Sequence, residues 1–325
     1  MIDDPVLIND WHPVAHLGEF HERPVIPARL LGEDLVLWRV GDNYLAWQDL
    51  CVHRGTRLSL GKIVDDNLLM CLYHGWTYNE EGRCVRIPAH PDQKPPAKAR
   101  VKQYQTRQRY GLLWVCLGEP ANDIAPFPEN ETPGFVTAVC DPARHVRANG
   151  PRLIENFLDA AHFPYVHEGV LGDPDHPEIP DYQARIGPDG VESDPILVYQ
   201  PAPYGSQPGV VEYVYHAYRP LTAHFSKKTG EKVFGLMLAI TPHDEGDSTG
   251  WFIVADQEPG GSVALKASYS PRILRIFEED RVIVESQRPE LLPLDLQEEL
   301  HLRSDRVAIA YRSWLRQLGV RLGVA

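Results

Sequence analysis

Over the first third of the chain, between residues 11 and 117, hydrophobic positions come in short runs that Gly, Asp and Asn interrupt. β-Branched and aromatic residues dominate these runs, as in strands. Residues 35–40 and 44–47 flank Gly41-Asp42-Asn43, a sequence that is typical of a hairpin turn. Further strands are predicted over residues 68–78, 83–87 and 111–117. The pattern indicates a small antiparallel β-domain.

The pattern changes after residues 119–134, which are rich in Pro, Asn, Asp and Glu, lack periodicity and are interpreted as a linker. Two helices are expected beyond it, over residues 152–169 and 271–289. Strand-like runs lie between these helices, at residues 209–216, 233–241 and 250–256. We therefore expect an α+β protein, with a β-domain over residues 1–120 and a second domain over 121–325 that packs helices on an antiparallel sheet.

Two Cys/His pairs stand out in the β-domain: Cys51 with His53, and Cys71 with His74. The first pair is spaced i, i+2, which places both side chains on one side of an extended backbone. The second pair spans a turn that ends at Gly75. Each loop therefore offers one thiolate and one imidazole to a common point.

The order of these residues bears on the metal. Zinc fingers usually draw two Cys from one element and two His from another, whereas each loop here mixes the two residue types. The pattern C-x-H, seventeen residues, C-x-x-H matches the Rieske signature, in which two Cys hold one iron and two His the other. A colourless zinc site remains the alternative. Nearby, Gly55 and Trp76 either tune the site, through a backbone N–H and shielding from water, or are ordinary turn and core residues.

Composition narrows the functional classes. The chain has 325 residues and is 43% hydrophobic, enough for two cores. Its net charge of −13 argues against nucleic acid as a partner, and five unevenly spaced cysteines do not form a disulfide framework. With no apolar run of membrane-spanning length and no signal-peptide pattern at the start, we expect a cytoplasmic location. Residues 83–109 are locally basic and are a candidate docking face for an acidic electron donor.

A second group of polar residues lies in the helix predicted over residues 152–169. Asn156, Asp159 and His162 follow one another at i+3 and so share one side of a helix. His167 is five residues beyond His162, about 140° further round a regular helix. The two imidazoles would converge only if the helix is distorted, and Pro164 between them supplies a cause.

Two His need a carboxylate to form the facial triad of a non-haem iron(II) site. Asp280 is flanked at i±3 and i±4 by apolar residues, and a carboxylate on an apolar face is costly unless it is paired or metal-bound. We expect Asp280 to be the third ligand, with Asp256 and Glu285 the next candidates. Glu278 and Glu279 have arginines close by and are interpreted as solvated acids.

These motifs together resemble those of the oxygenase α-subunits of Rieske non-haem iron oxygenases, over nearly the whole chain. The second motif is similar to the family pattern N-x-x-D-x-x-H-x-x-x-x-H, at Asn156, Asp159, His162 and His167, and the third to E-D-x-x-x-V-E-x-Q, from Glu279 to Gln287. The resemblance is greatest to the α-only group of O-demethylases and alkaloid hydroxylases. It implies a [2Fe-2S] cluster, mononuclear Fe(II), a helix-grip catalytic domain and a head-to-tail homotrimer.

The resemblance also implies a function: hydroxylation or oxidative demethylation of a small ring compound with O₂. In such trimers electrons pass from His74 of one subunit to Asp159 of its neighbour. A cis-dihydroxylating dioxygenase and a non-catalytic Rieske electron carrier are the alternatives. The chain has no dinucleotide-binding fingerprint, so a separate reductase or ferredoxin must supply electrons from NAD(P)H.

The substrate is not predicted. Pocket walls are expected from the strands between residues 197 and 256, the loop 170–188 and the stretch after Gly260. The acidic residues of that loop are interpreted as solvated charges rather than as a site for a cationic substrate.

Overall fold

The computed structural model describes residues 2–65, 67–203, 207–258 and 260–325. They form two compact units, one of Ile2 and residues 8–123 and the other of residues 3–7 and 124–325. Residues 3–7 join the second unit because the Asp4 carboxylate accepts the backbone N–H groups of Arg321 and Leu322 at 2.8 and 2.9 Å. The domain boundary near residue 120 stays a prediction.

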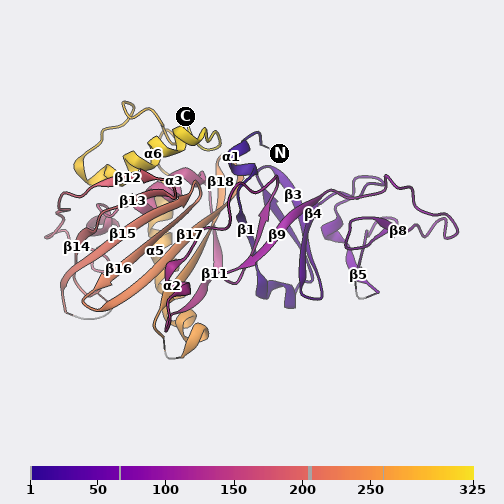
Figure 1. Ribbon diagram of the computed structural model, residues 1–325, viewed down its shortest axis with the longest axis horizontal. Coiled ribbons are helices and arrows are strands. Elements are labelled where there is room, and N and C mark those ends of the chain that lie inside the picture. Colours follow the sequence, from indigo (N-terminus) through magenta and orange to yellow (C-terminus); the bar gives the residue numbers. More distant parts are fainter. Residues whose placement is uncertain (1, 66, 204–206, 259) are drawn as a thin grey trace. The chain divides into compact units, whose positions relative to one another are not determined.

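The first unit is built on a six-stranded antiparallel sheet in the order β1-β10-β9-β4-β3-β2 (Figure 1). Its core includes Trp38 and Trp47, which are fully buried and pack edge to face with ring centroids 4.8 Å apart. The predicted hairpin is confirmed, since β3 ends at Val40 and β4 begins at Asn43. The strands are β1 (His12–His16), β2 (Val25–Leu30), β3 (Glu33–Val40), β4 (Asn43–Gln48), β9 (Gln103–Arg109) and β10 (Leu112–Cys116).

A smaller four-stranded sheet, β5-β6-β7-β8, is inserted between β4 and β9 and carries the Cys/His loops. The first loop precedes β5 and the second connects β6 to β7. Its strands are β5 (Lys62–Val64), β6 (Leu68–Met70), β7 (Thr77–Tyr78) and β8 (Cys84–Arg86), and short 3₁₀ helices η1 (Leu17–His21) and η2 (Leu58–Leu60) complete the unit.

The second unit contains a long antiparallel sheet in the order β11-β18-β17-β16-β15-β13-β12, with β14 also paired to β15. Three of its strands, β15, β17 and β18, were predicted, whereas the other five were not. The strands are β11 (Val136–Val146), β12 (Ala184–Gly187), β13 (Gly190–Ser193), β14 (Ile196–Gln200), β15 (Gly209–Arg219), β16 (Thr222–Thr229), β17 (Lys232–Asp244) and β18 (Asp247–Asp256). The fold class is confirmed.

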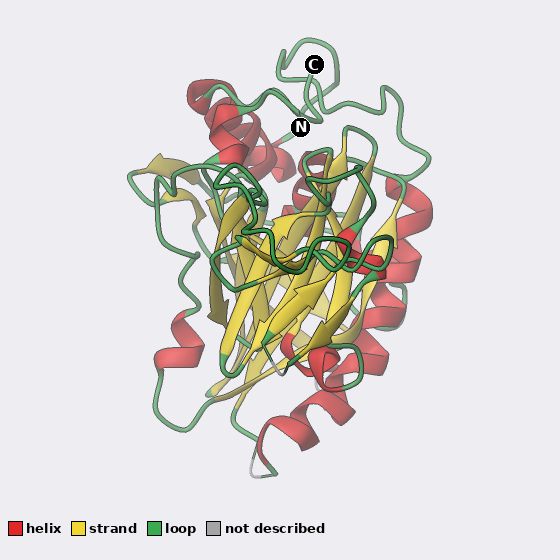
Figure 2. Ribbon diagram, turned by 90° about the vertical axis from the view of Figure 1, so that its right-hand side faces the viewer, coloured by secondary structure: helices red, strands yellow, loops and turns green. Residues whose placement is uncertain are grey.

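Helices pack on this sheet (Figure 2). The longest, α5 (Gly261–Val284), lies against β11 and β18, whereas α3 (Gly150–Leu158) contacts β16 and β17 and α6 (Arg306–Leu318) contacts β12 and β13. Within the described part of the chain, no helix is long and apolar enough to cross a membrane. The remaining helical segments are α1 (Pro5–Ile8), α2 (Pro128–Glu131), α4 (Phe163–Val166) and η4 (Arg303–Asp305).

Both predicted helices differ from the observed ones. The helix expected over residues 271–289 begins ten residues earlier, at Gly261, so that Pro271 lies inside it, and it ends at Val284. The helix expected over 152–169 is two helices, α3 and α4, and the break lies at residues 159–162, before Pro164 rather than at it. Pro164 occupies the first turn of α4, where its missing N–H needs no partner.

A cluster of two buried arginines and two partly buried glutamates fixes α3 in the second unit. Arg152 and Arg312 are 2% and 3% exposed. Arg152 contacts Glu299 at 2.9 Å, and Arg312 contacts Glu155 at 2.9 Å and also reaches Glu299. The cluster therefore ties α3 to α6 and to the segment between α5 and α6, and each charge is compensated by a partner.

We predict that Arg312→Met lowers the free energy of unfolding of the second unit by about 3–5 kcal/mol, because the partly buried Glu155 and Glu299 lose a buried partner. Thermal unfolding of the variant measures this. Arg316→Met, an exposed change one turn further along α6, is the control and should leave the melting temperature within about 1 °C. Equal melting temperatures for the two variants would contradict the role given to the cluster.

Candidate metal centres

The two Cys/His loops of the first unit share one backbone conformation. The Gly55 N–H donates to the Cys51 carbonyl at 2.9 Å, and the Gly75 N–H donates to the Cys71 carbonyl at 3.1 Å. Both glycines have positive φ, 70° and 69°, which a side chain would disfavour. The N–H of Gly55 is thus engaged within its own loop, so Gly55 is a turn residue and not a donor to the site.

The four candidate ligands separate into a thiol pair and an imidazole pair. Cys51 and Cys71 are 2% and 1% exposed, and burial together with the neighbouring Cys51 raises the pKa of the Cys71 thiol. The rings of His53 and His74 lie 4.6 Å apart, with His74 exposed. Among the described residues these four do not bring three ligand atoms within 4.8 Å of one another, as a single ion would need. Two like pairs suit the two irons of a Rieske cluster rather than one zinc.

One buried atom supports this assignment. The Nδ1 atom of His53 is shielded from solvent and has no hydrogen-bond partner among the described residues. An unsatisfied buried nitrogen is costly unless it binds a ligand. The residues present therefore fit a [2Fe-2S] cluster held by two thiolates and two neutral imidazoles.

Two aromatic residues shape the surroundings of these ligands. The indole of Trp76 stacks on the His53 ring with centroids 4.4 Å apart and planes 5° from parallel, which supports its predicted shielding role. Tyr78, which sequence reasoning missed, places its hydroxyl 3.1 Å from the Sγ of Cys51. Burial and this contact raise the pKa of Tyr78 well above its usual range, so the hydroxyl keeps its proton and can donate it to a Cys51 thiolate. The contact joins residues 27 apart in the chain, so spacing along the sequence does not show it.

In the second unit, three side chains converge on one point. The Nε2 atoms of His162 and His167 lie 3.3 Å apart, and the Oδ1 of Asp280 lies 3.3 and 3.0 Å from them. An ion about 2.1 Å from each ligand atom would separate neighbouring ligand atoms by about 3.0 Å at octahedral and 3.4 Å at tetrahedral angles. The observed spacing fits a bound metal, and two His with one carboxylate is the donor set of mononuclear iron(II) sites.

The single turn of α4 separates the two histidines. His162 precedes it with a helical backbone, whereas His167 follows it with φ −119° and ψ 39°, outside the helical region. Gly172 lies against this turn, where a Cβ atom would come 2.4 Å from the backbone nitrogen of Pro164. The Gly169 N–H donates to the Gly172 carbonyl at 2.9 Å and closes the loop behind His167.

A second layer of carboxylates orients the two imidazoles. Asp159 contacts the Nδ1 of His162 at 3.0 Å, and Glu279 contacts the Nδ1 of His167 at 2.8 Å. Each imidazole is thereby turned so that its Nε2 faces the third ligand. Glu279 was expected to be a solvated acid, and that expectation is wrong, although it also bonds Arg275 as anticipated. Its position next to Asp280 in the sequence could have suggested a role in the site. The imidazole that it contacts is determined by how α5 packs.

The charges of this site are mutually dependent. Burial alone would raise the pKa of Asp280, but hydrogen bonds from His162 and His167 hold it below its usual range. Burial alone would lower the pKa of His162, but Asp159 and Asp280 raise it to about 9. The metal-free site therefore favours a positive charge between its carboxylates, which a divalent cation supplies. The amide of Asn156 lies 3.4 Å from the Asp280 carboxylate.

The other two candidates for the third ligand are engaged elsewhere. Asp256 accepts from the hydroxyl of Tyr269 and pairs with Lys232 at 3.5 Å. Glu285 accepts the backbone N–H of Arg147 at 3.1 Å, outside the site. Of the three carboxylates considered, only Asp280 meets both imidazoles.

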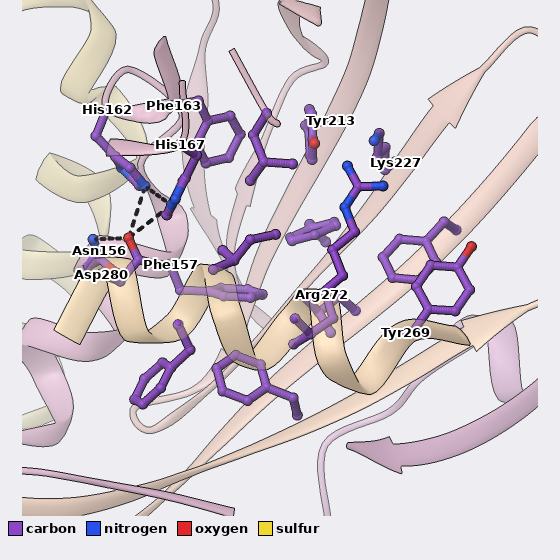
Figure 3. Close-up of a pocket in the computed structure, with 18 residues that line it drawn as sticks. Asn156, Phe157, His162, Phe163, His167, Tyr213, Lys227, Tyr269, Arg272 and Asp280 are labelled. Carbon is purple, nitrogen blue, oxygen red and sulfur yellow. Dashed lines mark hydrogen bonds and ion pairs between the residues drawn. The ribbon is translucent and has the colours of Figure 1, made fainter. Parts of the chain in front are cut away.

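A pocket of about 730 Å³, including its open mouth, extends from the three ligands (Figure 3). Strands β15–β18, helices α3 and α5, the α4 turn and Leu171 of the following loop line it. Its walls are mostly aromatic and aliphatic, including Phe157, Phe225, Phe252 and Phe277. This lining is typical of sites for small organic molecules.

Comparison with known proteins agrees with this geometry. Residues 10–105 match the Rieske [2Fe-2S] domain, and residues 146–321 match the vanillate O-demethylase oxygenase C-terminal domain. The chain is 33% identical to methylxanthine N1-demethylase NdmA of Pseudomonas putida, over 95% of this chain and 88% of that protein. It is 28% identical to methylxanthine N3-demethylase NdmB of the same species, over 98% and 91%.

Solved structures extend the similarity. Pseudomonas putida NdmA with caffeine superposes with a TM-score of 0.82 at 28% identity, covering 96% of this chain and 90% of that one. Dicamba monooxygenase bound to 3,6-dichlorosalicylic acid gives a TM-score of 0.79 at 21% identity, over 96% and 97%, a likeness of fold.

We predict that Tyr78→Phe lowers the reduction potential of the cluster, because the hydroxyl stabilises the more negative, reduced state at Cys51. A hydrogen bond to a charged group is worth about 1.5 kcal/mol, so the shift should be on the order of 50 mV. Redox titration of the cluster absorbance measures it. Tyr44→Phe, in the six-stranded sheet of the same unit, is the control. An unchanged potential in Tyr78→Phe would show that its hydroxyl does not bond the sulfur.

We also predict that Glu279→Ala weakens iron binding by the second unit by about 10- to 100-fold, because His167 loses the partner that orients its ring. Iron retained after dialysis against a weak chelator measures the effect, with the cluster absorbance as an internal reference. Glu278→Ala removes the neighbouring carboxylate, which pairs with Arg281 instead, and should bind iron normally. Equal iron retention by the two variants would refute the orienting role.

Proposed function

Since this chain belongs to the Rieske non-haem iron oxygenases, we propose that it is the oxygenase component of a system that demethylates or hydroxylates a small ring compound with O₂. The observation that best supports this proposal is that His162, His167 and Asp280 meet at one end of an apolar pocket. An electron carrier would have no use for such a pocket. N-Methyl and O-methyl groups are the favoured targets, because the relatives that match nearly the whole chain include N-demethylases.

The proposal assigns each cofactor its own residues. Cys51, His53, Cys71 and His74 would hold the Rieske cluster, and His162, His167 and Asp280 would hold mononuclear iron(II). When bound, the two groups supply single-electron transfer and the activation of O₂ respectively.

The other residues of the site orient the ligands and shape the pocket. Asp159 and Glu279 hold the imidazoles, and the Asn156 amide contacts the carboxylate between them. The aromatic walls exclude water from the reacting centre and leave space for a planar ring beside the ligands. A methyl carbon is thereby held where oxygen insertion would release it as formaldehyde.

The proposal places the electron transfer between two copies of the chain. His74 is exposed at the tip of the first unit, and its neighbours Leu72 and Tyr73 are 62% and 63% exposed. Exposed apolar residues around a redox group are typical of an interaction surface. Asp159 leads from the surface to His162, with its side chain 34% exposed. In a head-to-tail homotrimer, which closes by rotation, His74 of one subunit would meet Asp159 of the next.

Electrons would come from a separate reductase or ferredoxin that draws on NAD(P)H. The segment 83–109 offers a basic surface for an acidic partner of this kind: Arg83, Lys94, Lys98, Arg100 and Lys102 are all exposed. Because NAD(P)H is an intracellular reductant, we place the enzyme in the cytoplasm.

The proposed activity is tested by supplying the purified chain with a reductase and NADH and screening N-methyl and O-methyl ring compounds. The expected result is oxygen uptake that depends on substrate and is matched by formaldehyde release or by a hydroxylated product. If no compound stimulates oxygen uptake in enzyme that holds both iron centres, the proposal fails. A cis-diol product would instead identify a dihydroxylating dioxygenase.

We predict that Asp159→Asn retains both metal centres but reduces turnover coupled to the electron donor by on the order of 100-fold. The reason is that the carboxylate holding the His162 Nδ1 proton, and offered to the adjacent subunit, is lost. Stopped-flow reoxidation of the cluster with substrate and O₂ measures the step. Asp175→Asn, in an exposed loop, is the control, and normal turnover by Asp159→Asn would remove the bridging role.

A further inference from the structure

The pocket has two polar ends. The three candidate iron ligands form one, and Lys227 and Arg272 lie at the other (Figure 3). Arg272 and Asp280 are eight residues apart in α5, which places their Cα atoms about 12 Å apart along the helix. Between them the wall is apolar, with Ile273, Ile276 and Phe277 from α5. Among the residues that line the pocket, Lys227 and Arg272 are the two lysine or arginine side chains.

Lys227 is directed into the protein, which is unusual for lysine. It is 4% exposed, whereas Lys228, the next residue of β16, is exposed on the opposite face of the strand. Burial and the charges of Arg272 and Lys232 lower the pKa of Lys227 to about 7. At neutral pH, Lys227 is therefore only partly protonated, and the pocket end carries less positive charge than two free side chains would.

Arg272 has no carboxylate partner among the described residues. Its hydrogen bond is to the carbonyl of Val170 at 3.4 Å, long for such a contact. Asp256, which accepts a hydrogen bond from the pocket residue Tyr269, pairs with Lys232. In Figure 3 the guanidinium points toward Lys227 and Tyr213. A guanidinium beside an ammonium, at the end of an apolar pocket, is a site for an anion.

On the basis of the proposed function, the geometry points to a substrate class: a small aromatic carboxylic acid, whose carboxylate binds Arg272 and Lys227 while its methyl-bearing or reacting carbon faces the iron ligands. The apolar wall between the two ends accommodates one ring. The site suits a single negative charge better than a phosphate dianion, because burial limits the positive charge that it holds. The acidic residues of loop 170–188 do not line the pocket and offer no counterpart for a cationic substrate.

The inference is tested by direct binding, with matched ligands that differ only in charge. The probes are 2-, 3- and 4-methoxybenzoate and the three corresponding methoxybenzamides, titrated calorimetrically into the oxidised holoenzyme without reductase. We expect at least one carboxylate to bind at least tenfold more tightly than its amide. Arg272→Gln should reduce that preference about 10- to 100-fold, and Lys227→Gln should reduce it to a smaller extent.

Two further variants separate recognition from folding. Lys228→Gln removes a lysine from the solvent face of the same strand and should leave the preference unchanged. Arg272→Lys keeps a positive charge and should restore part of the preference lost in Arg272→Gln, which a purely structural role would not explain. Equal binding of carboxylate and amide by the wild type, no binding of any carboxylate, or an unchanged ratio in Arg272→Gln would each overturn the inference.

The outcome is distinguishable from a failure of the proposed function. Formaldehyde release from a neutral methoxybenzamide that binds as well as its acid would keep the demethylase and remove the anion site. Selective carboxylate binding by an enzyme that oxidises no compound would keep the site and remove the demethylase.

Discussion

The structure depends on a carboxylate that is buried between two imidazoles. Asp280 reaches His162 and His167 from a segment more than a hundred residues away, and neither an isolated carboxylate nor two facing ring nitrogens would be stable in an apolar pocket without a cation. The α4 turn places the two histidines, Gly172 packs closely against that turn, and the carboxylates of Asp159 and Glu279 orient the imidazoles. A metal held there has aromatic walls on one side and Asp159, leading toward solvent, on the other.

The same division of polar and apolar surroundings governs the first unit. Its thiols are buried beside the Tyr78 hydroxyl, whereas the imidazole of His74 is exposed among apolar residues. A cluster held in this way would be shielded from water at its cysteine side. It would be open to solvent at its histidine side, where an electron would leave. Each unit therefore presents one polar residue to a partner, His74 in the first unit and Asp159 in the second. The proposed trimer brings His74 of one subunit to Asp159 of the next.

Sequence reasoning could propose site residues that lie close together in the chain or differ in polarity from their neighbours. The Cys/His pairs and the set Asn156, Asp159 and His162 could be recognised because their members are few residues apart, and Asp280 because its neighbours are apolar. It failed where tertiary pairing decides. Strand β16, with two adjacent lysines, carries no clear alternation, and only its register shows that Lys227 faces inward. Glu279 and Tyr78 likewise acquire their roles from contacts between separate elements.

The central claim is that one chain carries two distinct iron centres, one on each unit. The most direct test is the content of iron and acid-labile sulfide in the wild type and in Asp280→Ala. The account predicts the two irons and two sulfides of a Rieske cluster in both proteins, together with one further iron in the wild type only. Zinc in place of iron, or loss of the cluster iron when Asp280 alone is replaced, would contradict it.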